Sequence, residues 1–258
     1  MMITSKQNSQ IKHLLALQQK SSLRNKEGLF VLEGQRELEH CLNSGYEIET
    51  LFVCPKLTSF SVAQTTKTIE VSADVYGRIA YREGTEGVIA IMRTRQHHLE
   101  DLKLNATPLI MVLESVEKPG NLGAILRTAD AANVDAVIVC NPLTDLYNPN
   151  LIRASIGALF TVPIATCSTE ECIAYLKKKN ISILTAQLQD SHLYYNTPMT
   201  GPTAIVMGTE STGLTLPWRE AATSHIRIPM LGALDSLNVS VSAAILIFDA
   251  VRQRQTKH

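Results

Sequence analysis

From Leu109 onward the sequence alternates apolar segments with stretches of helical spacing, and this alternation constrains the fold more than any other feature. The apolar segments read LIMVLES, DAVIVC, TVPIA, ISILTA and TAIVMG, and a short HIRIP follows them. Strands that are apolar along their whole length are buried on both faces, which is typical of a parallel sheet covered by helices. Residues 108–258 are therefore predicted to form an α/β domain. Its helices are expected over 121–132, 150–159, 170–179 and 237–255.

The first 98 residues predict a second, smaller α/β domain. Helical spacing indicates helices over 8–19, 35–43 and 74–80, and the segments GLFVLEG, ETLFVCP, 68–72 and 87–93 are typical of strands. The polar stretch TRQHHLEDLKLNAT ends this pattern before Pro108. The sequence thus predicts domains over 1–98 and 108–258 with a linker over 99–107.

Charge and composition exclude several classes of protein. The net charge of the 258 residues is zero, so no global basic field attracts nucleic acid, although the first 36 residues are locally basic. No apolar run is long enough to span a bilayer and no secretory signal is evident, so we expect a cytoplasmic protein without membrane contact. The basic residues of the N-terminal stretch, opposed only by Glu27 and Glu33, are Lys6, Lys12, Lys20, Arg24, Lys26 and Arg36.

Motifs for common cofactors and metals are missing from the sequence. There is no G-x-G-x-x-G, no P-loop and no H-E-x-x-H. The cysteines are odd in number and form no C-x-x-C pair, which argues against a disulfide framework and against a zinc–thiolate site. No metal is therefore expected. The five cysteines are Cys41, Cys54, Cys140, Cys167 and Cys172.

The first polar cluster, ESVEKPGNLGAILR, occupies residues 114–127 and leads from a strand into a helix. Asn121 is expected near the helix N-terminus, where it would cap the helix and where free backbone amides favour an anion. Arg127 follows a little under two turns later, so the two side chains are expected on roughly neighbouring sides of the helix. Taken alone, the pattern also fits a capped helix with a surface arginine.

The second polar cluster, MGTESTG, occupies residues 207–213 and follows the apolar strand TAIV. Gly208 and Gly213 permit unusual backbone geometry and let a ligand approach the main chain closely. Glu210 lies at the carboxyl end of a parallel strand, where open α/β sheets bind ligands. A glycine-flanked glutamate is also common in solvated turns, so this cluster alone does not distinguish a ligand site from a turn.

The third polar cluster, IPMLGALDSLNVS, occupies residues 228–240 and precedes an otherwise apolar final helix. Ser236, Asn238 and Ser240 stand at the start of that helix. Helix capping accounts for one of these polar side chains but not for three. The cluster therefore indicates that a polar group, either a ligand or another backbone, docks there.

Taken in order, NLGAILR, GTESTG and IPMxG…SLNVS resemble the signature motifs of the SpoU (TrmH) family of RNA ribose methyltransferases, in the SPOUT superfamily. In the N-terminal domain, KEGLFVLEGQREL and GVIAIM are similar to the family's L30e-like substrate-binding extension. The resemblance implies that the C-terminal parallel-sheet domain contains a deep trefoil knot, an exception to the rule against knots. It also implies a homodimer with active sites at the subunit interface, built partly from the final helix.

The resemblance further implies S-adenosyl-L-methionine as the cofactor, bound mainly through backbone groups. The matching cofactor positions are Gly208, Ile228 and Leu237, with Met207 and Met230 close by. Because the sulfonium is an activated donor, the protein must place the ribose oxygen and help remove its proton. We hypothesise that Arg127 stabilises the developing alkoxide and orients a phosphate. The residues expected to order Arg127 and the ribose are Asn121, Glu210, Ser236 and Asn238.

The predicted activity is methylation of a ribose 2′-hydroxyl in structured RNA. Ribosomal RNA is favoured because similar two-domain relatives act on it more often than on transfer RNA, and the basic N-terminal residues fit a domain that docks on folded RNA. Transfer RNA is a second possible substrate. The residues also leave open a knotted enzyme that methylates a base nitrogen, a non-catalytic RNA-binding protein that retains the fold and, on fold class alone, a nucleotide-dependent oxidoreductase.

Overall fold

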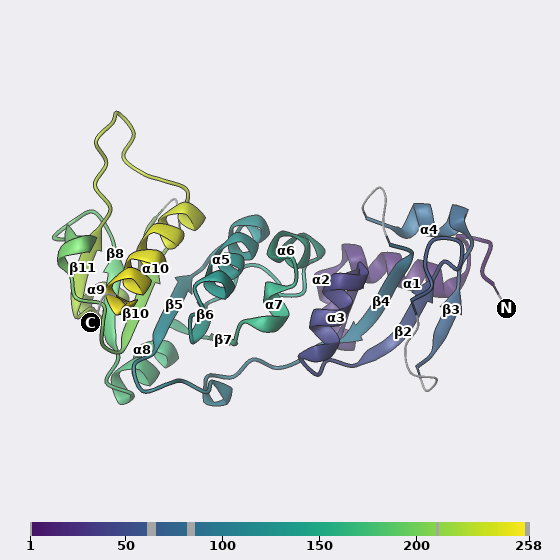
Figure 1. The fold of residues 1–258 in the computed structure, drawn as a ribbon, viewed down its shortest axis with the longest axis horizontal. Helices are drawn as coiled ribbons and strands as arrows, with labels where there is room; N and C mark the ends of the chain where they lie inside the picture. The colour runs from purple at the N-terminus through teal and green to yellow at the C-terminus, as the bar shows by residue number, and fades with distance from the viewer. Residues whose placement is uncertain (1, 61–65, 82–85, 210–211, 256–258) are drawn as a thin grey trace. The chain divides into compact units, whose positions relative to one another are not determined.

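The computed structural model describes residues 2–60, 66–81, 86–209 and 212–255 (Figure 1). The chain divides into two compact units. The N-terminal unit comprises Met1–Gln96 together with Asp145–Thr161, and the C-terminal unit comprises His97–Thr144 and Val162–His258. Across the described part of the chain, no helix combines the length and apolar character needed to cross a membrane.

The N-terminal unit is built on a four-stranded sheet in the order β1-β4-β2-β3. Strand β4 pairs antiparallel with both β1 and β2, and β3 lies parallel to β2. The predicted helices and strands of this region are confirmed to within a few residues, and a further short helix, α2, was not anticipated. The elements are α1 (Ser9–Gln19), α2 (Ser21–Glu27), β1 (Leu29–Glu33), α3 (Gln35–Asn43), β2 (Ile48–Val53), β3 (Thr68–Glu70), α4 (Ala73–Ile79) and β4 (Val88–Arg93).

Residues 145–161 pack with the rest of the N-terminal unit through aromatic contacts. The ring of Tyr147 stacks on Phe30 with centroids 4.4 Å apart, and Phe160 stacks on the same ring at 5.9 Å. The single helix predicted over 150–159 is instead two helices, α6 (Pro149–Ser155) and α7 (Ala158–Thr161). The break falls at Ile156 and Gly157, which both have positive φ angles that no α-helix continues through.

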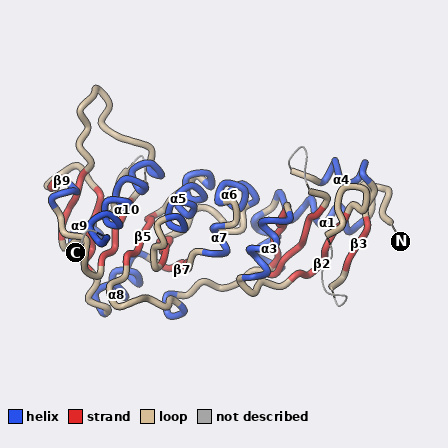
Figure 2. Tube along the Cα trace, in the orientation of Figure 1, coloured by secondary structure: helices blue, strands red, loops and turns tan. Residues whose placement is uncertain are grey.

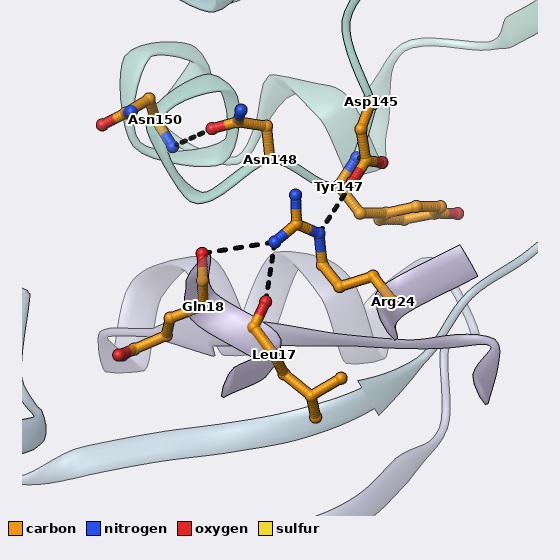
Figure 3. A network of polar contacts seen from close by, with 7 residues as sticks. All are labelled: Leu17, Gln18, Arg24, Asp145, Tyr147, Asn148 and Asn150. Carbon is orange, nitrogen blue, oxygen red and sulfur yellow. Dashed lines mark hydrogen bonds and ion pairs between the residues drawn. The ribbon is translucent and has the colours of Figure 1, made fainter. Parts of the chain in front are cut away.

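A buried polar network joins this segment to the start of the chain (Figure 3). Arg24 Nε donates to Asp145 Oδ2 at 2.7 Å, and its Nη1 donates to the carbonyl oxygens of Leu17 at 2.6 Å and Gln18 at 3.2 Å. The side chains of Arg24 and Asp145 are only 3% and 10% exposed. Arg24 is one of the basic residues that were expected to fit docking on RNA, and for Arg24 that expectation is wrong because its side chain is buried in this network.

The C-terminal unit contains a seven-stranded sheet in the order β7-β6-β5-β10-β8-β11-β9. Every pairing in it is parallel, which confirms the sheet predicted from the apolar runs. All residues of the central strands β5 and β10 are buried. The strands are β5 (Leu109–Glu114), β6 (Ala136–Cys140), β7 (Ile164–Cys167), β8 (Ser182–Ala186), β9 (His192–Leu193), β10 (Thr203–Met207) and β11 (Ser224–Arg227).

Two groups of helices cover this sheet. Helix α10 packs on α5, β5 and β10, whereas α8 packs on α9, β6 and β8. Alternate strand residues such as Ile110 and Val112 join a core that includes Trp218 of α9 and Leu176 of α8. The helices are α5 (Pro119–Ala131), α8 (Thr169–Lys178), α9 (Leu216–Ala221) and α10 (Val239–Gln255), with short 3₁₀ turns η1 (Leu99–Asp101) and η2 (Tyr194–Asn196).

The start of α5 differs from the sequence prediction in one respect that affects the site. Pro119, whose fixed φ angle suits the first helical position, begins the helix, and Lys118 is its N-cap. Asn121 is therefore the third residue of the helix rather than its cap. The capping role that the sequence assigned to Asn121 is wrong, and its side chain bonds elsewhere.

Candidate functional site

A pocket of about 570 Å³ opens at the carboxyl ends of three adjacent strands, β10, β8 and β11. This volume lies within the range of roughly 300–1,000 Å³ that is usual for small-ligand sites. The strand residues at its base are Ala186, Met207 and Ile226, and the loops that follow these strands form its walls. Parallel sheets bind ligands at this edge because their loops and strand ends converge there.

The loop after β10 forms one wall, and it needs a glycine at its first position. A Cβ atom on Gly208 would collide with the backbone of Gly213 and Leu214, so only glycine allows the loop to fold back this closely. Thr209 Oγ1 accepts from the backbone N–H of Thr212 at 3.0 Å and secures the turn. Glu210, a predicted catalytic residue, lies outside the described residues.

The segment between β11 and α10 forms the opposite wall and is loop throughout (Figure 2). Asn238 caps α10: its Oδ1 accepts from the backbone N–H of Ser240 at 2.9 Å and from the Ser240 hydroxyl at 2.6 Å. Its Nδ2 donates to Asn121 Oδ1 at 3.2 Å. This hydrogen bond joins the first and third polar clusters, which lie 117 residues apart in the sequence.

Most of the predicted site residues converge on this pocket. All five cofactor candidates line it, as do two of the catalytic candidates: Met207, Gly208, Ile228, Met230 and Leu237, together with Ser236 and Asn238. Asn121 lines a smaller adjoining pocket of about 120 Å³, which shares Gly208, Thr209 and Val239 with the large one. Arg127 lines neither pocket and is exposed on the outer side of α5.

Two polar side chains that sequence reasoning missed also line the pocket. Gln187 directly follows β8, and Arg219 belongs to α9. Gln187 Oε1 and Arg219 Nε are buried and have no hydrogen-bond partner within the described residues. An unpaired buried acceptor or donor costs about 1–3 kcal/mol. These atoms therefore suit a bound ligand that carries both amino and carboxylate groups.

Glu114 anchors the loop and helix beside the pocket. Its side chain is 1% exposed, at the carboxyl end of β5. Its Oε1 accepts from the hydroxyls of Thr169 and Thr215, both at 2.7 Å, and its Oε2 accepts from the Thr215 backbone N–H at 2.9 Å. These bonds compensate the cost of burying a carboxylate. They also fix the first residue of α8 and the N-cap of α9. A lone glutamate ending an apolar strand was the only sequence signal for this anchor.

These features define the class of the molecule, an α/β protein that binds a small ligand at the carboxyl edge of a parallel sheet. Residues 108–248 match the family model described as the SpoU rRNA Methylase family, and residues 8–90 match that of the MRM3-like substrate binding domain. Because the first match covers more than half of the 258 residues, the chain belongs to the SpoU rRNA methylase family.

Individual relatives agree with the family match. The chain is 27% identical over 247 residues to 23S rRNA (guanosine(2553)-2′-O)-methyltransferase RlmP of Bacillus subtilis, covering 95% of this chain and 97% of the relative. It is 38% identical over 181 residues to 23S rRNA (guanosine-2′-O-)-methyltransferase RlmB of Vibrio vulnificus, covering 68% and 73%. The crystal structure of an AdoMet-bound rRNA methyltransferase from Sinorhizobium meliloti superposes with a TM-score of 0.89 at 30% identity, covering 98% and 97%.

Proposed function

We propose that this protein transfers a methyl group from S-adenosyl-L-methionine to the 2′-hydroxyl of a ribose in ribosomal RNA. The main support is that the cofactor candidates, from the loop after β10 and the loop before α10, line one pocket beside the Asn121–Asn238 contact. The relatives from Bacillus subtilis and Vibrio vulnificus, which are named as guanosine 2′-O-methyltransferases of 23S rRNA, support a guanosine target.

The cofactor fits the residues present. Gly208, Ile228 and Leu237 would hold it, with Met207 and Met230 beside them, and the unpaired Gln187 and Arg219 atoms would receive its polar groups. When bound, it supplies an electrophilic methyl group. The chain's own contribution is to exclude water, to hold the ribose oxygen in line and to stabilise the charge that develops as its proton leaves.

The ribose would lie where the two pockets meet. Asn121 lines the smaller pocket, Ser236 and Asn238 line the larger, and Gly208 borders both. Amide and hydroxyl groups at this junction can hydrogen-bond a ribose. Glu210, which follows Thr209 in the sequence, is proposed to act with them. A guanidinium stays protonated in proteins, so Arg127 would act as an electrostatic group rather than as a base.

Arg127 is proposed to reach the active site of a second copy of the chain. It is exposed and lies outside both pockets of its own chain. Large apolar side chains of the loop before α10 and of α10 itself are also exposed to solvent. Leu231 is 96% exposed, Leu234 79%, and Phe248 of α10 47%. Soluble monomers rarely expose such a group of residues. A homodimer that covers them and places Arg127 at the partner's pocket accounts for both observations.

The N-terminal unit is proposed to guide the RNA. Four lysines of the basic stretch are exposed, Lys6, Lys12, Lys20 and Lys26, and Arg36 is exposed as well. Phosphate contacts from such residues position an RNA without reading its sequence. A cytoplasmic location is proposed as well, and an rRNA substrate is compatible with it. The knot in the C-terminal unit and the L30e-like fold of the N-terminal unit stay predictions.

The activity is tested with the purified full chain, labelled cofactor, and separate ribosomal and transfer RNA fractions. We expect label in 23S rRNA, and mass mapping of the digested nucleosides should find 2′-O-methylguanosine. Methyl groups on a base would overturn the ribose assignment. Label confined to transfer RNA would overturn the proposal that ribosomal RNA is the substrate. Absence of any binding of the cofactor or its demethylated product, measured by calorimetry, would favour a non-catalytic RNA-binding protein.

The shared active site is tested by heterodimers that carry one Arg127→Ala chain and one Gly208→Ala chain, purified with two different affinity tags. If Arg127 serves the partner's pocket, one site of the heterodimer is intact, so about half of the wild-type activity should return. If Arg127 serves its own chain, each site carries one lesion and the heterodimer should be no more active than the mean of its two parents. Light scattering on the wild-type chain checks the dimer itself.

A further inference from the structure

Three cysteines of the C-terminal unit meet at the carboxyl edge of the sheet, away from the cofactor pocket. Cys140 ends β6, Cys167 ends β7, and Cys172 lies near the start of α8. Cys140 and Cys167 are direct register partners in the parallel pair β6–β7. None of the three lines the proposed cofactor pocket. The proposed methyl transfer therefore assigns them no role.

The separation of the sulfur atoms matches a metal site better than a disulfide. The Sγ atoms of Cys140 and Cys167 are 4.0 Å apart, and all three Sγ atoms lie within 4.8 Å of one another. Zinc–sulfur bonds of about 2.3 Å in a tetrahedral site hold sulfurs roughly 3.8 Å apart. A disulfide needs about 2.05 Å. Side-chain rotations that move the sulfurs by up to about 1 Å would give the zinc geometry. A disulfide would require the Cys140 and Cys167 sulfurs to approach by about 2 Å.

The surroundings of the three sulfurs also suit a bound cation. Cys140 and Cys172 are fully buried, which shields a metal–sulfur bond from water, and Cys167 is half-buried, which leaves a route for an ion to enter. Cys167 directly precedes Ser168, the N-cap of α8. The partial positive charge at a helix N-terminus favours the thiolate form that metals bind. Two strand ends and one helix supply the ligands, so their positions are held by the fold.

We propose that Cys140, Cys167 and Cys172 bind one thiophilic metal ion of the Zn²⁺ type. Three thiolates leave one position of a tetrahedral ion for water or another ligand. The ion would tie the ends of β6 and β7 to α8 and so stabilise this edge of the sheet. The sequence predicted no metal because the cysteines form no C-x-x-C pair. That rule applies to metal sites built from one or two short loops. Here three separate elements bring the ligands together.

The test uses the reduced, chelator-treated full chain. Zn²⁺ is titrated against a chromophoric chelator, and Cd²⁺ is added separately to record its ultraviolet thiolate charge-transfer band. We expect one ion per chain and protection from alkylation of Cys167, the half-buried thiol of the three. Cys167→Ala, a half-buried position that should not disturb the core, should weaken Zn²⁺ binding more than about 100-fold, since even outer-shell partners are worth 10–100-fold. Cys172→Ala should do the same.

Cys41→Ala is the matched control for Cys172→Ala, because Cys41 is as buried as Cys172 but belongs to the N-terminal unit. It should bind Zn²⁺ as the wild-type chain does. S-adenosyl-L-methionine should not compete with the metal, which keeps this result separate from that of the methyltransferase assay. Zn²⁺ binding that survives in Cys167→Ala would overturn the proposal. So would a reduced wild-type chain that gives no cadmium–thiolate band, or one that binds Zn²⁺ no better than Cys167→Ala does.

Discussion

Arginine and asparagine side chains have different roles in two regions: the Arg24 network of the N-terminal unit, and the packed helices α5 and α10 of the C-terminal unit. Arg24 is buried and hydrogen-bonds to Asp145 and two carbonyls, whereas Arg127 is exposed. Asn148 caps α6 through a local hydrogen bond, whereas Asn238 caps α10 and also reaches Asn121. A buried and paired side chain such as Arg24 stabilises the fold, whereas an exposed one such as Arg127 can contact a ligand or a partner chain.

The largest expected effect on stability is that of Arg24→Ala. The variant leaves the Asp145 carboxylate buried without its charged partner, which typically costs about 3–5 kcal/mol of unfolding free energy. Denaturant unfolding of the N-terminal unit measures this. Arg36→Ala, at an exposed arginine of the same unit, should change the free energy by less than about 0.5 kcal/mol. If the two variants lowered the free energy of unfolding equally, the buried Arg24–Asp145 pair would stabilise the fold no more than an exposed arginine does.

Arg127→Ala should affect catalysis and leave stability unchanged. Removing one group that stabilises a developing oxyanion typically lowers kcat by about 10²–10³-fold. Steady-state methylation assays measure the rate, and a thermal melt checks that Tm is constant. Arg127→Lys keeps the charge but loses the planar fork of donors. A lysine variant with the wild-type rate would show that charge alone suffices and that positioning by the guanidinium is unnecessary.

Gly208→Ala should weaken cofactor binding by about 10-fold or more, or about 1.4 kcal/mol. The added Cβ meets the backbone of Gly213 and Leu214, so the loop that forms one wall of the pocket must move. Calorimetric titration with S-adenosyl-L-methionine measures the affinity. Gly201→Ala, just before the same strand β10, is the control because its Cβ meets no atom within 4 Å. A matching loss of affinity in both variants would contradict the proposed pocket.

The smallest expected effect separates the two asparagine caps. Asn148→Ala and Asn238→Ala should each lower the unfolding free energy by about 1 kcal/mol, because each removes a helix N-cap. Only Asn238→Ala should also slow methyl transfer, since only Asn238 lines the pocket and contacts Asn121. If the two variants methylate RNA at the same rate, Asn238 is a structural cap and no more.

Sequence reasoning predicted the parallel sheet because continuous apolar strands have few other ways to be buried. It also identified the loops that line the pocket, because glycines and small polar residues directly after such strands are a local signal. It misplaced Asn121 as the cap of α5, since Pro119 extends the helix by two residues. Glu114 was given no role because its partners lie far away in sequence. Gln187 and Arg219 were given none because no local pattern marks a buried polar atom that lacks a partner.

By itself, the sequence determined the order and type of most elements, the apolar faces of the strands, and the three polar clusters that mark the family. These are local properties, set by residue periodicity and by backbone preferences over a few positions. The tertiary structure decided which distant side chains meet: Asn121 with Asn238, Arg24 with Asp145, and the three thiols of the proposed metal site. Such contacts depend on how strands order themselves in a sheet, which no local pattern encodes.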